Sequence, residues 1–269
     1  MISNTALGHK IKALQAFTAT VLRAGRGIMG TATPMQPEQA LILYEYEACP
    51  YARRVREVMT YLNLDYESRP SPKNGLLYRN ELQALAGKTQ VPFFIDNNTD
   101  TQILESQAII EHLFAHYSAK GSIPKKYQKP RGKDNASLLN KIASVSTMMR
   151  GFKAVHPKQN EARGKPAQPL HLYGFEASPF CRLIRERLCE LEVGYINHNV
   201  AREQLGDMGA FGRRFGFGEY QPITGGKRER IKNEEMAGKL QFPYLVDPNT
   251  DTQIYESKDI IDYLEHNYG

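Results

Sequence analysis

The residue best placed for chemistry in this 269-residue chain is Cys49, in the segment CPYA. The apolar residues 41–44 precede it and predict a strand, and Pro50 directly after it suits the first position of a helix. The free backbone N–H groups and the dipole at a helix start favour an anion, and they lower the pKa of a cysteine placed there. Arg53, one turn further on, would add positive charge. We therefore expect Cys49 to be a reactive thiolate rather than a plain helix cap.

The segment that holds this cysteine occurs twice. LILYEYEACPYARRVRE (residues 41–57) aligns with LHLYGFEASPFCRLIRE (170–186), and VPFFIDNNTDTQILESQAIIEHL (91–113) aligns with FPYLVDPNTDTQIYESKDIIDYL (242–264). Two such blocks in the same order indicate a duplication. The second copy is longer between the blocks, so we expect an insertion near residues 200–225.

Each copy also carries a proline before a strand and a Glu-Ser pair before its last helix. These residues are Pro92, Glu105 and Ser106 in the first copy, and Pro243, Glu256 and Ser257 in the second. A cis proline could turn the preceding backbone toward a ligand, although proline at a strand start is also ordinary. A helix N-terminus with a serine binds a carboxylate, and a neighbouring glutamate suits an ammonium group. Together they would hold the zwitterionic end of an amino acid; the alternative is that each serine only caps its helix.

The pattern of apolar residues and turns predicts the order β-α-β-α-β-β-α in each copy. The first helix begins at Pro50, a hairpin surrounds the turn at 96–100, and a last helix starts near Ser106. We predict an α/β protein with two such domains. The chain divides into an N-terminal helix and lead-in (1–40), a first domain (41–117), a basic connector with a helix near 136–149 (118–169), and a second domain (170–269).

Each copy resembles the N-terminal, thioredoxin-fold domain of the glutathione S-transferases and the related glutaredoxins. The residues that carry the resemblance are CPYA at 49–52, Val91-Pro92 with Phe242-Pro243, and the two Glu-Ser pairs. CPYARRVR is most similar to the omega class, whose cysteine forms a mixed disulfide with glutathione. The resemblance implies a four-stranded mixed sheet flanked by helices in each domain, two cis prolines and glutathione as cosubstrate. It also implies that the backbone of Val91 binds the cysteinyl part of glutathione and that the Glu-Ser pair binds its γ-glutamyl end.

The chain departs from that family in two respects. The all-helical domain that supplies the family's hydrophobic substrate pocket does not follow, so we do not expect conjugation of bulky electrophiles. The second copy reads SPFC, with Ser178 in place of the thiol and Cys181 where glutaredoxins keep a resolving cysteine. Cys181 lies inside a helix and is a secondary candidate, and Cys189, which aligns with Thr60, is expected to pack in the core.

We therefore predict a glutathione-dependent thiol oxidoreductase or transferase. Cys49 would form a mixed disulfide with glutathione and act on a small-molecule or protein thiol or disulfide, by a monothiol route because Ala52 offers no second thiol. The second copy would bind glutathione without using Ser178 as a nucleophile. The alternative is a non-catalytic scaffold that binds glutathione or a partner.

The composition restricts these functions further. Three cysteines are too few for a disulfide framework, which indicates a reducing compartment such as the cytoplasm. The net charge of +6 is concentrated in the connector 118–169, with twelve basic and two acidic residues, and we expect no nucleic-acid partner. The glycine-, arginine- and aromatic-rich stretch 211–217 leaves RNA binding as a minor alternative. We predict no metal site and no membrane span, and the sequence leaves the oligomeric state open.

The first thirty residues allow two interpretations. An apolar stripe at helical spacing, formed by Leu7, Ile11, Leu14, Phe17 and Val21, lies among basic residues, and the first acid is Glu38. Such a helix could be an organelle-targeting segment. We favour the other interpretation, in which the stripe packs on the two domains.

Overall fold

The computed structural model describes residues 6–23, 25–128, 152–158, 166–208, 222–236 and 238–269. The predicted connector helix near 136–149 and the loop 211–217 lie outside these residues. The first half of the chain forms α1 (Ala6–Leu22), β1 (Leu41–Glu45), α2 (Pro50–Leu62), β2 (Tyr66–Pro70), α3 (Tyr78–Ala86), β3 (Phe93–Asp96), β4 (Thr101–Leu104), α4 (Ser106–Tyr117) and the 3-10 turn η1 (Lys125–Tyr127).

The second half repeats this order with a middle helix that is α-helical in its first turn and π-helical after it. It forms β5 (Leu170–Gly174), α6 (Pro179–Glu190), β6 (Tyr195–Asn199), the 3-10 turn η2 (Leu205–Met208), α8 (Lys227–Arg230), the π-helical turn η3 (Ile231–Glu235), β7 (Tyr244–Asp247), β8 (Thr252–Tyr255) and α9 (Ser257–Tyr268). The predicted insertion near residues 200–225 falls between β6 and α8, and residues 209–221 lie outside the described part of the chain.

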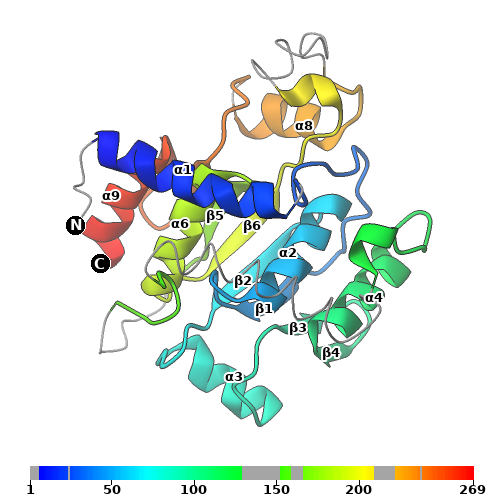
Figure 1. The fold of residues 1–269 in the computed structure, drawn as a ribbon, viewed down its shortest axis with the longest axis horizontal. Coiled ribbons are helices and arrows are strands. Elements are labelled where there is room, and N and C mark those ends of the chain that lie inside the picture. The colour runs from blue at the N-terminus through cyan, green and yellow to red at the C-terminus, as the bar shows by residue number, and fades with distance from the viewer. Residues whose placement is uncertain (1–5, 24, 129–151, 159–165, 209–221, 237) are drawn as a thin grey trace.

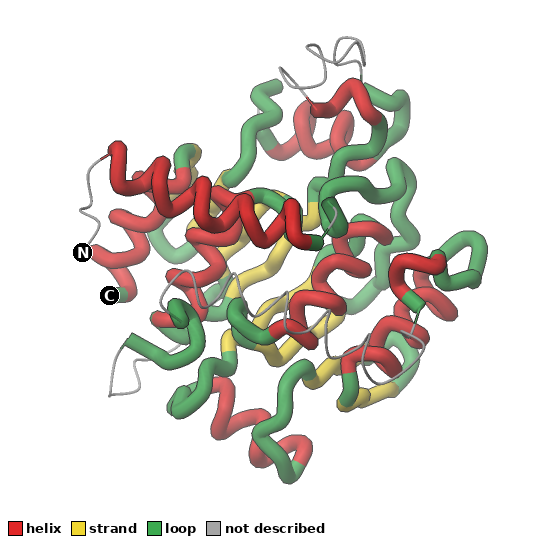
Figure 2. Tube along the Cα trace, viewed as in Figure 1, coloured by secondary structure: helices red, strands yellow, loops and turns green. Residues whose placement is uncertain are grey.

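The eight strands form one mixed sheet in the order β4-β3-β1-β2-β6-β5-β7-β8 (Figure 1, Figure 2). Each half contributes four strands, in which β1 and β2, or β5 and β6, are parallel and the other pairs are antiparallel. The halves join through the antiparallel pair β2–β6. The predicted α/β class and the four-stranded thioredoxin-like halves are therefore confirmed, whereas their fusion into one sheet was not anticipated.

The β2–β6 junction lies on a pseudo-two-fold axis. Glu67 faces Ile196 across it, and these two residues occupy equivalent positions in the two copies. An interface in which equivalent positions meet is isologous, the kind formed by two-fold symmetric dimers. The chain thus has, within itself, the arrangement of a homodimer.

The pseudosymmetry includes the segments that precede each copy. The backbone N–H of Arg202 donates to the carbonyl of Ile28 (2.9 Å), and that of Lys73 donates to the carbonyl of Val155 (2.7 Å). Arg202 and Lys73 are equivalent residues, so Ile28 and Val155 play matching roles. Each preceding segment therefore crosses to the opposite half of the sheet.

The core of the first half lies between the sheet and helices α2 and α4, and the core of the second half lies between the sheet and helices α6 and α9. In α2 the residues Val55, Val58 and Met59 are fully buried beneath α4, as the apolar spacing predicts. In the second half Ile184 and Leu188 of α6 occupy the corresponding places and pack with α9. These contacts hold the start of α2 at the end of β1, and the start of α6 at the end of β5.

The packing of α1 corrects the sequence interpretation. Its small residues Ala13 and Ala16 are buried against α6, whereas the described part of the predicted stripe, from Ile11 to Val21, faces solvent, with Leu14 67% and Val21 61% exposed. Small side chains let the two helix backbones approach closely, which the larger stripe would prevent. Among the described residues, no helix is long and apolar enough to cross a membrane.

Asp96 organises the turn after β3 and ties it to α4. Its carboxylate accepts hydrogen bonds from the backbone and side chain of Asn98, from His112 Nε2 (2.8 Å) and from the Tyr117 hydroxyl (2.7 Å). Burial alone would raise the pKa of Asp96, but these donors outweigh it and lower the pKa to about 2. Asp247 has the corresponding role in the second copy, with donors from α9.

We expect Asp96→Asn to lower the free energy of unfolding at neutral pH by about 2 kcal/mol, since the folded state favours the ionised carboxylate. A depressed pKa contributes stability that is present above the unfolded value of about 4 and is lost as the pH falls through about 2. Urea unfolding of both proteins across this range measures the effect. A difference between variant and wild type that stays constant down to about pH 2 would contradict it.

Candidate active site

Cys49 lies at the predicted position, directly before Pro50 at the N-terminus of α2. Its sulfur accepts a hydrogen bond from the backbone N–H of Ala52 (3.5 Å), so it is the N-cap of the helix. The Cys49 thiol also lies 4.0 Å from the carbonyl oxygen of Val91, to which it donates. The strand, the helix start and the proline loop therefore meet at this sulfur.

The predicted ionisation of Cys49 is wrong for the protein without a ligand. The residue is only 2% exposed, and burial raises the pKa of its thiol. The N–H groups of Ala52 and Tyr51 act in the predicted direction but do not compensate for the loss of water. Arg53 does not supply the expected charge either, because its guanidinium turns to Glu57 (3.2 Å). Cys49 is thus mainly a protonated thiol at neutral pH.

Both predicted cis prolines are confirmed. The bonds Val91-Pro92 and Phe242-Pro243 are cis. In the first copy the carbonyl of Val91 faces the Cys49 thiol, so this loop and the sulfur border the same space.

The Glu-Ser pairs show a shared backbone strain. Glu105 and Glu256 have φ angles of 79° and 68°, in the left-handed region that residues other than glycine rarely adopt. Each lies just before the last helix of its copy and makes no side-chain cap. Such strain persists where the surrounding structure imposes it and is typical of ligand sites. Both copies thus present the same backbone geometry at the helix start where the sequence predicts amino-acid binding.

In the second copy, α1 lies over the equivalent groups. His9 Nε2 lies 2.7 Å from the Ser257 hydroxyl, and the His9 ring stacks near Phe180, with centroids 6.4 Å apart. Further along α1, the Thr20 hydroxyl donates to the carbonyl of Ala177, next to Ser178. A ligand held by Ser257 would have to displace α1.

The two remaining cysteines are packed inside the protein. Cys181 is fully buried, and a Cβ added at Gly174 would meet its sulfur at 2.4 Å, so the thiol fills the space that glycine leaves. Cys189 donates to the carbonyl of Ala154 (3.6 Å). Burial raises the pKa of both thiols. These contacts support the packing role predicted for Cys189 and give Cys181 a packing role as well.

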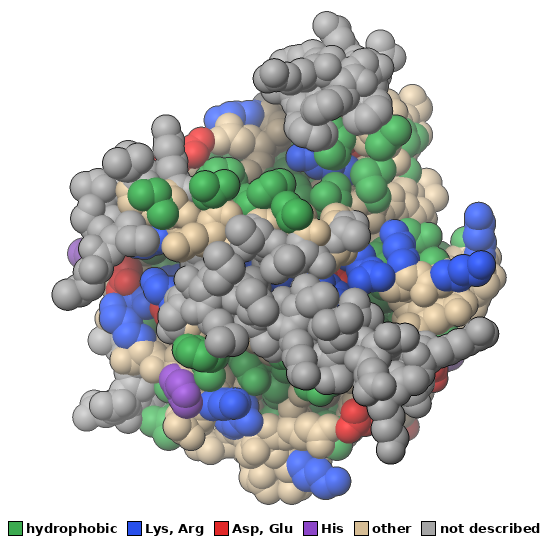
Figure 3. Space-filling view, viewed as in Figure 1, with side chains coloured by type: hydrophobic (Ala, Val, Ile, Leu, Met, Phe, Trp, Pro, Cys, Tyr) green, Lys and Arg blue, Asp and Glu red, His purple; other side chains and the backbone are tan. Residues whose placement is uncertain are grey.

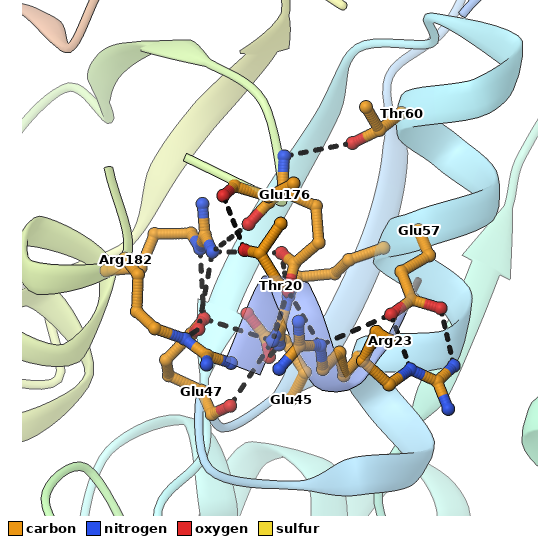
Figure 4. Close-up of polar contacts among 12 residues, drawn as sticks. Thr20, Arg23, Glu45, Glu47, Glu57, Thr60, Glu176 and Arg182 are labelled. Carbon is orange, nitrogen blue, oxygen red and sulfur yellow. Dashed lines mark hydrogen bonds and ion pairs between the residues drawn. The ribbon is translucent and has the colours of Figure 1, made fainter. Parts of the chain in front are cut away.

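Between α2 and α6, buried arginines and glutamates form an ion cluster that both halves share (Figure 4). Its members are Arg23, Glu45, Glu47, Arg53, Arg56, Glu57, Glu176, Arg182 and Arg185. Arg56 Nε lies 2.9 Å from Glu176, and Arg185 Nε lies 2.9 Å from Glu47. Because these are two sets of equivalent residues, each half supplies the arginine that binds the other half's glutamate.

The cluster determines the charge of its carboxylates. Burial would raise the pKa of Glu47, but Arg185, Arg56 and Arg182 hold it well below its usual range. Burial does raise the pKa of Glu45, which Arg56 only partly opposes. This cluster was not predicted, although the sequence carries a signal for it: both copies keep a glutamate before the Cys/Ser-Pro step and two arginines after it.

Among the described residues, no group of histidine, cysteine, aspartate and glutamate side chains has an arrangement that could hold a metal ion.

The first copy offers a thiol, a backbone carbonyl and a strained Glu-Ser helix start. These groups suit a small peptide with a thiol and a free amino-acid end.

Comparison with known sequences shows which domain family the chain resembles. A model of the glutathione S-transferase N-terminal domain matches residues 43–121 and 217–269. The match is to that domain in general and does not support the omega class in particular. No curated protein and no solved structure matches the chain significantly. One matched segment lies in each half of the sheet, and both halves are thus similar in sequence and fold to the N-terminal, thioredoxin-like domain of the glutathione S-transferases.

Proposed function

We propose that the protein binds glutathione in its first copy and uses Cys49 for thiol–disulfide transfer in a reducing compartment such as the cytoplasm. The observation that carries the proposal is the convergence at one helix start of the Cys49 sulfur and the Val91 carbonyl, with the strained Glu105 before Ser106 in the same copy. These groups match glutathione, which has a thiol, peptide N–H groups and a zwitterionic γ-glutamyl end.

The reaction proceeds by two exchanges. The Cys49 thiolate attacks the glutathione sulfur of a glutathionylated substrate, the Cys49–glutathione disulfide forms, and the substrate leaves as a thiolate. The thiolate of a second glutathione then attacks that disulfide, which releases oxidised glutathione and restores Cys49. Ala52 supplies no second thiol, so the helix start itself supports this monothiol route alone.

A non-catalytic binding function is the second candidate, and a specific observation favours it. Cys49 is nearly inaccessible and its pKa is raised by burial, which opposes thiol chemistry in the ligand-free protein. In that case the same groups hold glutathione, and the fold serves binding or assembly.

Glutathione titration by calorimetry tests the binding step common to both. We expect one site in the wild type and about tenfold weaker binding in Ser106→Ala, because a hydrogen bond to the charged γ-glutamyl end is lost. Ser257→Ala is the matched control, since the Ser257 hydroxyl already contacts His9. Absence of binding, or binding indifferent to Ser106→Ala and weakened by Ser257→Ala, would contradict the proposed first-copy site.

A further inference from the structure

A cavity of about 400 Å³ lies between the second half of α1 and the loops that follow β5 and β6. Its walls are almost entirely apolar, and include Phe17, Val21, Ile28, Phe175, Pro179 and Met208. Cavities for small ligands range over roughly 300–1,000 Å³ and combine apolar walls with a few polar groups that fix orientation. This cavity is thus large enough for an organic molecule and is distinct from the Cys49 site.

Among the described residues that line the cavity, Arg202 is the charged one. Its Nη1 donates to the backbone carbonyl of Asp207 (2.6 Å), while the Asp207 carboxylate lies against Arg228. Within the described part of the chain, no carboxylate lies within ion-pair distance of Arg202. Its guanidinium instead lies 5.5 Å from the centroid of the Phe175 ring. The apolar cavity therefore has in its wall an arginine that forms no ion pair with the described residues.

The cavity opens beside the exposed side of α1. Phe17 and Val21 line it and are 46% and 61% exposed. Figure 3 shows hydrophobic side chains gathered along this helix. Leu14 continues the same stripe but does not line the cavity. A ligand in the cavity would cover apolar surface that now faces water, which is a favourable change.

We propose that this cavity binds an amphipathic monocarboxylate, with its apolar chain or ring between α1 and the β5 and β6 loops and its carboxylate paired with Arg202. Apolar walls alone would accept any hydrophobic molecule; the guanidinium selects an anion, and a carboxylate matches its planar fork of donors. The proposal goes beyond the thiol chemistry proposed for Cys49, because none of the cavity residues belongs to the first-copy site.

Tryptophan fluorescence provides the test, because the chain contains no tryptophan. Phe17→Trp places the only indole on the cavity wall, and Leu14→Trp places it on the same stripe outside the cavity. We expect saturable titration with octanoate to change the emission of the first variant and leave that of the second unchanged. Equal responses of the two reporters would overturn the proposal, since they would indicate adsorption to the stripe.

The role of Arg202 is tested in the Phe17→Trp protein by comparing octanoate with 1-octanol. We expect octanoate to bind about tenfold more tightly than the alcohol, and Arg202→Met to remove this preference. Circular dichroism checks the fold of the variant. If Arg202→Met does not fold, the preference of the Phe17→Trp protein for octanoate over 1-octanol still tests the proposal. Equal affinities of the two probes, or binding only to anionic phospholipid vesicles, would overturn the proposal.

Discussion

Replacing Cys49 with serine is expected to reduce the deglutathionylation rate to that of the uncatalysed exchange. Serine keeps the cap to Ala52 but cannot form a disulfide, and its hydroxyl pKa is too high for attack without an adjacent base. Reduction of a glutathionylated peptide, coupled to glutathione reductase, measures the loss. Cys189→Ser is the matched control, because that thiol is buried against Ala154 and should leave the rate unchanged.

The pH dependence of Cys49 reactivity in the wild-type protein follows from the burial of this thiol. Because burial raises the pKa of Cys49 above the ordinary value of about 8.5, the thiolate fraction in the ligand-free protein is small at neutral pH and grows as the pH rises. The rate at which iodoacetamide alkylates Cys49 should therefore rise with pH up to at least about pH 9 without reaching a plateau. In the deglutathionylation assay of Cys49→Ser described above, an undiminished rate would contradict the enzyme proposal and favour the non-catalytic one.

The Arg56→Met variant is expected to lose about 3–5 kcal/mol of unfolding free energy, the cost typical of removing one partner from a buried ion pair. Arg56 is 1% exposed and contacts Glu45, Glu47 and Glu176. Glu47 and Glu176 keep other arginines, whereas among the described residues the direct partner left to the Glu45 carboxylate is the Ser68 hydroxyl, 3.1 Å away. The cost therefore arises chiefly at Glu45.

Urea unfolding measures this loss without the ionic screening that guanidinium salts add. Arg54→Met on the same helix is the control: Arg54 donates to Gln107, and its loss should cost about 1 kcal/mol or less. A buried carboxyl with a raised pKa binds more protons when folded, so part of the Arg56→Met loss should be recovered at about pH 5. A loss no larger than that of Arg54→Met would show that the ion cluster does not stabilise the fold.

Local patterns sufficed to predict most elements of each half. The apolar run that begins at Leu41, the proline after Cys49 and the turn at Asp96 specify their strands, helix and hairpin through interactions close in sequence. The resemblance to a known domain added the cis prolines, which a single proline would not have established.

Features that depend on contacts between the halves could not be predicted in this way. Strand β2 carries no pattern that distinguishes an outer edge from one paired with β6, so the continuous sheet was missed. The orientation of α1 was predicted wrongly because hydrophobicity favoured Leu14 and Val21, whereas close helix packing required Ala13 and Ala16. The pKa of Cys49 was predicted in the wrong direction because burial is a tertiary property.

The isologous junction between β2 and β6 also bears on how the two halves can differ. In a dimer of identical chains, every substitution appears in both subunits at once, so a thiol cannot be lost on one side alone. Joining both halves in one polypeptide removes that constraint, and the chain shows the result at equivalent positions: Cys49 corresponds to Ser178, Glu45 to Gly174, and Ala52 to Cys181. Glu45 and Ala52 combine a larger residue with a smaller one, and Gly174 and Cys181 do so in the opposite order. Covalent linkage thus permits the two halves to diverge, so that one half keeps a cysteine at its helix start where the other carries a serine.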